Sequence, residues 1–460
     1  MANPFLHQYL PNTESQRADM LRAIGIKSVD RLFVDIPDQF RDPFLNLPDA
    51  LSELDLRREL EALARLNLPP GEYACFLGGG AYRHFIPSVV ESLLSRGELL
   101  TAYTPYQAEA SQGTLQATYD YQSLMCLLTG MEVANAGMYE GSTAFAEAAL
   151  MACRITHRSK VAVSQRVNPS YQAVLRTYLE PQGIQITSLV DNETAALLVQ
   201  YPDYFGAITS LSPAAEAAHD VGALLVVSTY PTALGLIRPP GDYGADIVTG
   251  ECQSLGVPLA FGGPYVGLLA CRERYLRQMP GRVVGKTVDT AGKPGYVLTL
   301  QTREQHIRRE GATSNICTSE ALVAMATTMY LAALGPIGLR NVAELCYQRA
   351  HYAASLIAQL PGYSILSHPA EEWRDKRKAN HGAGDLGSPS APAGQRSLWF
   401  NEFMVRGPTT PPEINRRLLE HQIIGGLDIS ATVPDAMLVC VTEMNSREEI
   451  EALAETLKDV

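Results

Sequence analysis

The chain has 460 residues, of which 46% are hydrophobic and 19% are charged, and its formal net charge is −12. This composition predicts a globular protein with more than one domain, and the negative charge argues against nucleic acid as a partner. No apolar run approaches the ~20 residues that span a bilayer, and residues 1–16 lack the features of a signal or transit peptide, so we expect a cytoplasmic protein with no membrane partner.

The first two regions of the chain differ in their hydrophobic period. Residues 1–70 predict a helical arm, with a helix over 51–66 that ends before Pro69, Pro70 and Gly71. Residues 71–334 alternate long helical patterns with short apolar runs, which is typical of an α/β domain with a mostly parallel sheet. The expected helices cover 114–128, 142–154 and 169–179, and the expected strands cover 160–163, 184–189, 204–208 and 223–227.

Residues 335–460 predict a small α+β domain. A helix is expected over 338–360, strands over 363–366, 397–405 and 437–441, and further helices from Thr410 and from Ser446. Thr410 precedes prolines suited to a first helical turn, and Ser446 with Glu449 forms a capping-box pattern. Residues 372–396 are polar and rich in Gly, Pro and Ser, which predicts a long, mobile surface loop.

The eight cysteines form no C-x-x-C pair, which argues against a zinc or redox motif. Most have apolar neighbours, and we expect small core residues in a reducing compartment. Cys252 stands next to Gln253, and a redox role is one interpretation of this cysteine. A buried structural thiol is favoured there, because no basic neighbour activates it.

Gly141, Ser142 and Thr143 directly precede an apolar helical run. Unpaired N–H groups at a helix N-terminus bind anions, so these residues could form a phosphate site. An ordinary Ser/Thr helix cap is the alternative, and Glu140 beside them would repel a phosphate. The segment 228–231 follows an expected strand, and the segment 250–264 is typical of a strand, a functional loop and a glycine turn. Ligands bind in loops at the carboxyl ends of parallel strands in open α/β sheets, but neither segment identifies a reaction by itself.

Two further polar segments are candidates for a pocket or an interface. In 103–109, Tyr103 and Tyr106 flank a proline, which suits a pocket rim or an anchored surface loop. The run 308–318 leads into an apolar helix, and it could be an interface loop, an anion site or a helix start at 318–320.

Long runs of the sequence resemble the P-protein family of the glycine cleavage system, and within it the first chain of the two-chain bacterial form. These runs are 103–137, 261–270, 300–322 and 439–450, and the similarity extends from the first residues almost to the end. The resemblance implies the type I fold of PLP-dependent aminotransferases, with a large, mostly parallel-sheet domain and a small C-terminal α+β domain. It also implies that glycine is decarboxylated and that its aminomethyl group passes to the lipoyl arm of H-protein, with PLP as the electron sink.

The sequence departs from the catalytic chains of this family at two positions. Those chains have the PLP-binding lysine five residues before the proline of a glycine-rich turn, and counting back from Pro258 gives Gln253. Ser228 stands where the family has the aspartate that pairs with the pyridinium nitrogen. An amide and a hydroxyl cannot replace those groups. No other lysine occupies a suitable strand end; they are Lys27, Lys160, Lys286, Lys293, Lys376, Lys378 and Lys458.

We therefore expect this chain to bind no PLP covalently and a catalytic β subunit to hold it in an α2β2 assembly. The degenerate cofactor positions are Ser142, Thr143, Ser228 and Gln253. Type I PLP enzymes build their sites at dimer interfaces, so the resemblance implies interface roles for two loops, with candidates Tyr103, Tyr106, Gln107, Thr313, Ser314 and Asn315. Glycine and lipoylated H-protein would be the further partners. The alternatives are a self-sufficient PLP enzyme and a non-enzymatic regulatory or scaffold module of the same fold.

Overall fold

The computed structural model describes residues 12–41, 43–69, 71–300, 304–367 and 398–460. The loop predicted at 372–396 lies outside the described residues. Contacts within the chain define two compact units, Met1–Leu68 and Pro69–Val460. The division of the second unit near residue 335 stays a prediction.

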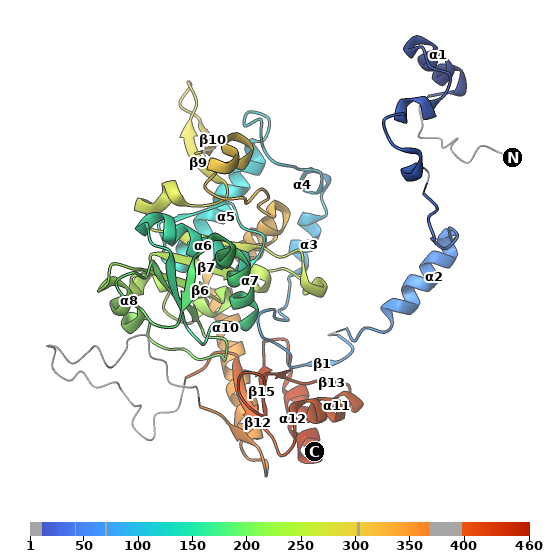
Figure 1. The fold of residues 1–460 in the computed structure, drawn as a ribbon. Coiled ribbons are helices and arrows are strands. Elements are labelled where there is room, and N and C mark those ends of the chain that lie inside the picture. Colours follow the sequence, from blue (N-terminus) through green and yellow to red (C-terminus); the bar gives the residue numbers. More distant parts are fainter. Residues whose placement is uncertain (1–11, 42, 70, 301–303, 368–397) are drawn as a thin grey trace. The chain divides into compact units, whose positions relative to one another are not determined.

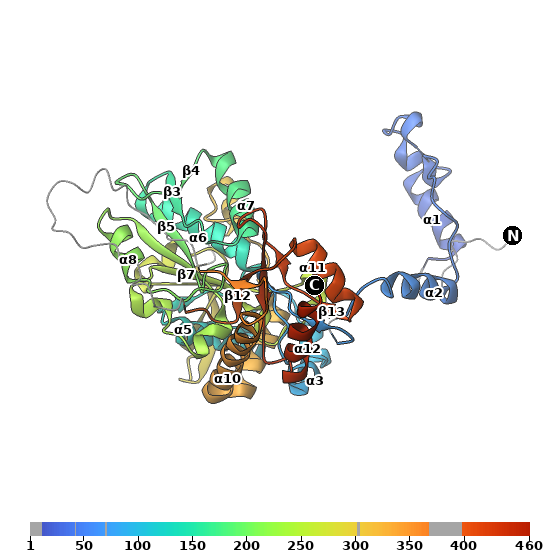
Figure 2. The same ribbon diagram turned by 90° about the horizontal axis from the view of Figure 1, so that it is seen from below.

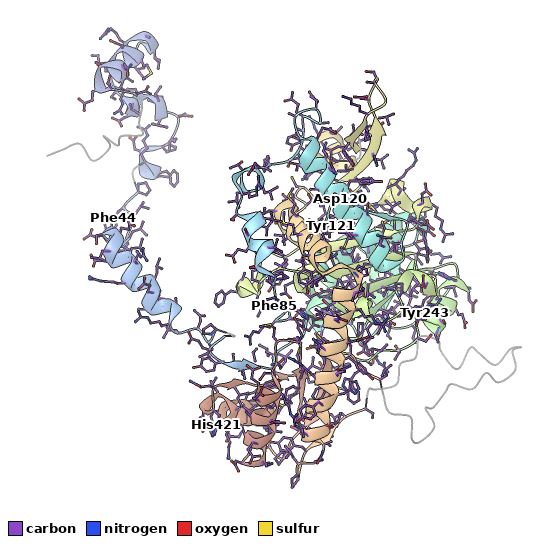
Figure 3. All side chains as sticks on the ribbon, turned by 180° about the vertical axis from the view of Figure 1, so that it is seen from behind. Phe44, Phe85, Asp120, Tyr121, Tyr243 and His421 are labelled. Carbon is purple, nitrogen blue, oxygen red and sulfur yellow. The ribbon has the colours of Figure 1, made fainter. Side chains whose placement is uncertain are left out.

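The first unit contains two separate helices, α1 (Glu14–Ile24) and α2 (Glu53–Ala64). Thr13 and Gln16 form a capping box at the start of α1, and Gly25 ends it in a left-handed conformation. Neither helix has a buried residue, and Phe44 between them is 91% exposed (Figure 3). The expected helix over 51–66 is therefore present as α2, and none of the described residues of this unit is buried.

A seven-stranded sheet organises the second unit, in the order β2-β8-β7-β6-β5-β3-β4 (Figure 1). Strands β3 to β7 run parallel, and β8 is antiparallel to both β7 and β2. The strands are β2 (Val133–Ala134), β3 (Lys160–Val163), β4 (Gln185–Thr187), β5 (Ala196–Tyr201), β6 (Leu224–Thr229), β7 (Ile247–Glu251) and β8 (Gly267–Cys271). This architecture confirms the predicted α/β class with a mostly parallel sheet.

Both faces of this sheet are covered by helices. Leu225 and Val227 of β6 join the core that includes α5, α8 and α10, whereas Leu224 and Val226 join the core that includes α6 and α7. Successive strand residues point to opposite faces, so a continuous apolar run serves both cores. The helices are α5 (Gln112–Thr129), α6 (Gly141–Thr156), α7 (Pro169–Leu179), α8 (Ser212–His219) and α10 (Ala321–Ile357).

Two of the expected elements are wrong in position. No strand forms over 204–208, where Ala207 makes an isolated bridge with Trp399, and the strand of this region is β5 (Ala196–Tyr201). Residues 196–201 are an apolar run that lies between β3 and β6, whereas the chain turns at Pro202. The helix expected over 338–360 begins at Ala321, and it continues through a non-helical Gly335 and Pro336 because both halves pack against the protein.

The C-terminal part builds a second, four-stranded antiparallel sheet in the order β11-β12-β15-β14. Helices α3 and α12 both contact α10 (Figure 2). A short parallel pair joins β1 to β13, so the chain near Ala74 packs with the C-terminal region. The bounds are β1 (Ala74–Cys75), α3 (Ser88–Leu94), β11 (Ser364–Ile365), β12 (Glu402–Arg406), α11 (Pro411–Glu420), β13 (Ile423–Ile424), β14 (Leu427–Asp428), β15 (Ala436–Cys440) and α12 (Arg447–Lys458).

Helix α10 is long and apolar enough, by length and composition, to cross a membrane. A core helix of a globular protein passes the same test, and α10 places Tyr330 and Ala354 in two of the hydrophobic cores. Core packing therefore accounts for its composition. The remaining elements are α4 (Gly97–Leu100), the hairpin β9 (Val283–Val288) with β10 (Pro294–Thr299), and α9 (Gln305–Arg308).

Candidate functional site

The residues predicted to be degenerate cofactor positions lie near one another, where strands β6 and β7 end. Ser228 of β6 pairs with Thr249 of β7, and Gln253 follows two residues after the end of β7 at Glu251. Ser228 and Gln253 are 2% and 1% exposed. The carboxyl ends of neighbouring parallel strands share one edge of a sheet, which explains why residues 25 positions apart in the sequence come together here.

Gln253 is held by three buried hydrogen bonds. Its Oε1 accepts from the backbone N–H of Tyr82 at 2.8 Å, and its Nε2 donates to the carbonyls of Tyr82 and Val257, both at 2.9 Å. All three hydrogen bonds of the amide are made with backbone groups. A lysine could not accept from Tyr82, so the site is built for an amide rather than an amine.

The N-terminus of α6 is capped by a carboxylate. Glu140 is the N-cap residue, and its side chain accepts from the backbone N–H groups of Ser142 and Thr143 and from the Ser142 hydroxyl, the last at 2.6 Å. The sequence left a phosphate site and a Ser/Thr cap as alternatives, and neither is the arrangement found. Ser142 and Thr143 lie inside the helix, and the residue beside them supplies the cap.

A second carboxyl group reaches the same helix end from β7. Glu251 accepts from the N–H of Gly141 through Oε2 and from the N–H of Gln253 through Oε1, both at 2.9 Å. Burial raises the pKa of Glu251 to about 8, and the nearby charge of Glu140 contributes in the same direction. Glu251 thereby links the α6 N-terminus to Gln253.

These residues do not fit a PLP group. The first turn of α6 has already given its N–H groups to Glu140 and Glu251, where a cofactor phosphate would need them. Ser228 offers no charge for a pyridinium, and Gln253 offers no amine. Among the described lysines, Lys160 is ion-paired with Asp191. Lys286 and Lys293 are exposed on the β9–β10 hairpin.

The segment 79–85 closes over this part of the sheet. Glu402 of β12 accepts from the N–H of Gly79 at 2.6 Å and from the Tyr82 hydroxyl at 2.9 Å. Burial raises the pKa of Glu402 to about 7, although both hydrogen bonds lower it. The rings of Tyr82 and Tyr230 lie 4.2 Å apart, so aromatic packing fills the space that follows β6.

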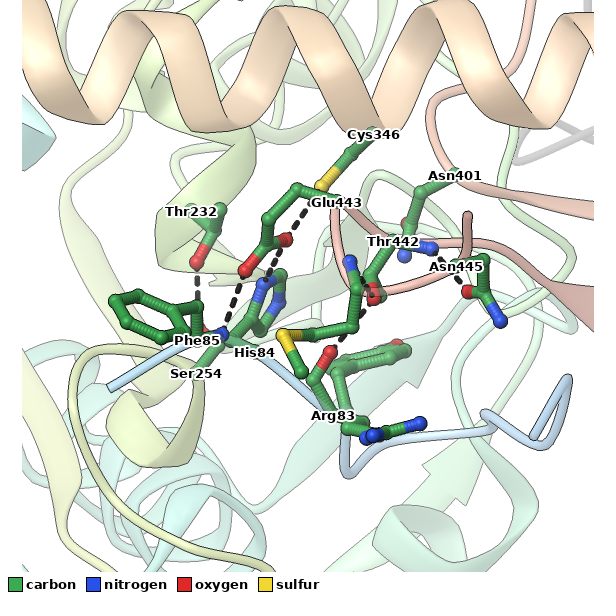
Figure 4. Close-up of polar contacts among 12 residues, drawn as sticks. Arg83, His84, Phe85, Thr232, Ser254, Cys346, Asn401, Thr442, Glu443 and Asn445 are labelled. Carbon is green, nitrogen blue, oxygen red and sulfur yellow. Dashed lines mark hydrogen bonds and ion pairs between the residues drawn. The ribbon is translucent and has the colours of Figure 1, made fainter. Parts of the chain in front are cut away.

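A buried network extends from this segment into the C-terminal region (Figure 4). His84 Nδ1 lies 2.7 Å from Glu443 Oε2, its other ring nitrogen bonds the Tyr230 hydroxyl, and the Cys346 thiol donates to Glu443 at 3.3 Å. Burial favours a raised pKa for Glu443, but the hydrogen bond and charge of His84 hold its pKa below the ordinary value. His84, Cys346 and Glu443 have the types and spacing of metal ligands. Because they are already hydrogen-bonded to one another, a structural network accounts for them.

Cys252 lies in the interior beside the degenerate site. Its sulfur is 3.9 Å from the Tyr121 hydroxyl and 3.8 Å from the sulfur of Met125. Burial raises the pKa of the Cys252 thiol far above its ordinary value, which keeps the thiol protonated and unreactive. This environment agrees with the structural thiol that the sequence favours.

The two predicted interface loops lie near each other. Tyr103 is 83% exposed and lines a cleft of about 290 Å³ together with Pro264, Arg282 and Leu322. Thr313 and Ser314 line a small adjoining hollow beside Gly281, and Asn315 is exposed. Tyr106 is also exposed, and Gln107 Nε2 donates to Glu109 at 3.0 Å. The structure thus gathers the two loops around residues 281–282.

Sequence reasoning missed the roles of three carboxyl groups. Glu140 was noted only as a group that would repel phosphate, and neither Glu251 nor Glu402 was singled out. A glutamate before an apolar helix is only a weak N-cap signal, because Ser, Thr, Asp and Asn are the preferred N-caps and Ser142 and Thr143 stand beside it. Glu251 gives a weaker signal, since only the fold brings it to a helix that begins 110 residues earlier.

Comparisons of the sequence with known proteins agree on one family. A model of the glycine cleavage system P-protein family matches residues 7–385. The chain is 48% identical to the probable glycine dehydrogenase (decarboxylating) subunit 1 of Desulforamulus reducens, over 98% of this chain and 99% of that protein. It is 49% identical to the protein of the same description from Thermomicrobium roseum, over the same shares of the two chains.

Solved structures support the same assignment. The chain resembles an inhibitor-bound glycine decarboxylase (P-protein) of the glycine cleavage system with a TM-score of 0.85 and 43% identity, over 98% of this chain and 100% of that chain. A C-DES mutant with glycine covalently linked to its PLP cofactor gives a TM-score of 0.56 at 14% identity, covering 90% of this chain and all of that one, and shows likeness of fold alone. This chain therefore has the fold of PLP-dependent enzymes and belongs to the glycine cleavage system P-protein family.

Proposed function

We propose that this chain is the subunit of a two-chain glycine decarboxylase that does not hold the cofactor. Together with a PLP-bearing β subunit, in an α2β2 assembly, it decarboxylates glycine in the cytoplasm and passes the aminomethyl group to the lipoyl arm of H-protein. The end-to-end similarity to subunit 1 proteins supports the reaction and a partner subunit. The amide of Gln253 at the lysine position carries the assignment of the cofactor to that partner.

The interior of this chain favours a supporting role over an independent activity. Gln253 is hydrogen-bonded to the backbone of Tyr82, and Glu140 and Glu251 accept from the N–H groups at the start of α6. The rings of Tyr82 and Tyr230 pack against each other. A cofactor could enter only if several of these buried contacts were broken, which would cost about 1–3 kcal/mol for each unsatisfied group. The fold is therefore stable without PLP in this chain.

The surface around Tyr103 is the face that we assign to the partner subunit. Tyr103 and Tyr106 are exposed aromatic side chains, and such residues are enriched in protein interfaces. The cleft beside Tyr103 is bordered by Leu322, and the adjoining hollow by Thr313 and Ser314. The partner's site would then receive its neighbouring residues from these two loops.

A decarboxylation assay tests this function. The exchange of 14CO2 into glycine is measured with H-protein present, for this chain alone, for the β subunit alone and for the mixture, and the visible spectrum of this chain is recorded after incubation with PLP. We expect a colourless, inactive chain that supports exchange only in the mixture. Exchange by this chain alone would make it a self-sufficient PLP enzyme. Binding to the β subunit without any effect on exchange would make it a regulatory or scaffold module.

A further inference from the structure

The first turn of α6 has no backbone N–H group left for a ligand. The N–H of Gly141 donates to Glu251, those of Ser142 and Thr143 donate to the Glu140 side chain, and that of Ala144 donates to the Glu140 carbonyl at 3.0 Å. The Ala144 bond is the first hydrogen bond within the helix. The three N–H groups before it have no partner inside the helix, and the side chains of two glutamates satisfy all three. The helix has 16 residues, so its dipole favours a negative charge at this end.

The two carboxyl groups come from different elements, and they accept from different N–H groups of the helix. Glu140 stands at the end of the loop that enters α6, with an extended backbone at φ −162° and ψ 177°. Glu251 ends β7 and also accepts from the N–H of Gln253. Burial, with the charge of Glu140 as a further cause, raises the pKa of Glu251 to about 8. The raised pKa favours the protonated form of Glu251.

Close packing fixes this arrangement. A Cβ atom added to Gly141 would lie 2.2 Å from the Tyr171 hydroxyl oxygen and 3.0 Å from the backbone nitrogen of Glu251. The helix N-terminus, β7 and Tyr171 thus approach one another as closely as a glycine allows. The Glu140 carboxylate makes the contacts with Ser142 and Thr143 that an oxyanion of a bound phosphate would make at such a turn.

We propose that the Glu140 carboxylate is a built-in replacement for a cofactor phosphate, and that removing it turns the N-terminus of α6 into a binding site for an inorganic or organic phosphate. The Glu140 carboxyl group then takes the position of the phosphate, and the N–H groups of Ser142 and Thr143 are paired without a ligand. This inference concerns the chain alone and does not depend on the partner subunit, so it can fail while the proposed function holds.

The test compares Glu140→Ser with the wild-type chain, using inorganic phosphate as the probe. Thermal unfolding and isothermal titration are followed at neutral pH, with phosphate replacing chloride at constant ionic strength. We expect Glu140→Ser to unfold at a lower temperature in chloride, and phosphate to raise its midpoint saturably by several degrees with a one-site isotherm. The wild-type chain should show no saturable response.

Two control variants sharpen the comparison. Glu140→Asp keeps a carboxylate at the helix end, so it should gain little or no phosphate binding. Glu180→Ser removes an exposed charge elsewhere and should behave like the wild-type chain. Equal phosphate binding by the wild-type chain and Glu140→Ser, or a folded Glu140→Ser with no saturable response, would overturn the proposal. If Glu140→Ser does not fold in chloride, recovery of folded protein in phosphate supports the proposal, and absence of recovery contradicts it.

Discussion

The buried residues at the ends of β6 and β7, called here the interior site, and the surface cleft beside Tyr103 are built in opposite ways. In the interior site, Gln253 is 1% exposed and bonded to backbone groups on two sides. In the surface cleft, Tyr103 is 83% exposed, and Leu322 at its border is also exposed. The interior site pairs the amide of Gln253 and the carboxyl groups of Glu140 and Glu251 within the chain, whereas the surface cleft leaves large apolar groups in contact with solvent.

This contrast indicates where the function of the chain lies. Buried amide and carboxyl groups that are already paired within the chain contribute stability and offer nothing to a ligand. Exposed aromatic side chains around a cleft gain free energy only when another molecule covers them. Under the proposed function, the interior of this chain serves as a scaffold, and the surface beside Tyr103 is the part that contacts the partner subunit.

The largest effect is expected from Gln253→Leu. The substitution keeps the volume but leaves the Tyr82 N–H and two backbone carbonyls unpaired in the interior. Each unpaired group costs about 1–3 kcal/mol, so the free energy of unfolding should fall by about 4 kcal/mol in urea denaturation. The matched control, Gln107→Leu at an exposed position, should change it by less than about 0.5 kcal/mol. Similar free energies of unfolding for the two variants would mean that the interior site is open to water.

The next effect concerns the pH dependence of stability. The pKa of Glu402 is raised from 4.5 to about 7 by burial. A raised pKa means that the folded state binds the proton more tightly, so this contribution is complete below pH 4.5 and is lost as the pH rises to about 7. Glu402→Gln should remove this loss, and above pH 7 it should recover up to about 3 kcal/mol in the free energy of unfolding relative to the wild-type chain.

Glu413→Gln is the control for this experiment. Arg416 and Arg417 lower the pKa of Glu413 to about 2 on the surface. Glu413 therefore contributes stability above pH 4.5 and loses it as the pH falls towards 2, the opposite direction from Glu402. Denaturation curves at several pH values separate the two variants. If Glu402→Gln ran parallel to the wild-type chain from pH 4.5 to 7, Glu402 would not be buried as described.

The elements that could be predicted from the sequence are those with strong local signals. Helix α7 covers 169–179 as expected, because Asn168 caps it and Pro169 suits its first position. Strand β5 was misplaced because a short apolar run does not show by its pattern alone whether it is a strand or a buried helix segment. The helix expected over 338–360 begins earlier, at Ala321, because packing on both sides continues α10 through Gly335 and Pro336.

The candidate site was predictable by residue type but not by geometry. The absence of a lysine at Gln253 and of an aspartate at Ser228 can be read from the sequence, since the resemblance fixes those positions. The sequence does not show that Glu140 folds back onto Ser142 and Thr143, because that depends on a side-chain rotamer. It does not show that Glu251 reaches Gly141 either, because the contact joins elements that are distant in the chain.

A smaller effect is expected at the surface cleft. Tyr103→Ala should weaken binding of the partner subunit by about 2 kcal/mol, which is about thirtyfold in Kd, because buried aromatic groups dominate interface energies. Tyr106→Ala should act in the same direction. Sedimentation of mixtures with the β subunit measures the affinity, and thermal unfolding of each variant alone should be unchanged. Tyr352→Ala, on α10 beside Glu451, serves as the aromatic control and should leave the affinity unaltered.

The smallest effect is expected from labelling two thiols, which changes no residue of the interior site or of the surface cleft. Cys317 is exposed, and its backbone N–H donates to the Tyr139 hydroxyl oxygen at 3.1 Å. Cys252 is buried beside Gln253 with a raised pKa. A maleimide followed by peptide mass spectrometry should therefore label Cys317 quickly and Cys252 only after unfolding, and Cys317→Ser should abolish the fast reaction. Cys317 lies one residue before Thr318, which lines the surface cleft, so the β subunit should slow its labelling. Unchanged labelling of Cys317 in the assembly would show that the interface does not include this loop. Rapid labelling of Cys252 in the folded chain would show that the interior site opens to solvent.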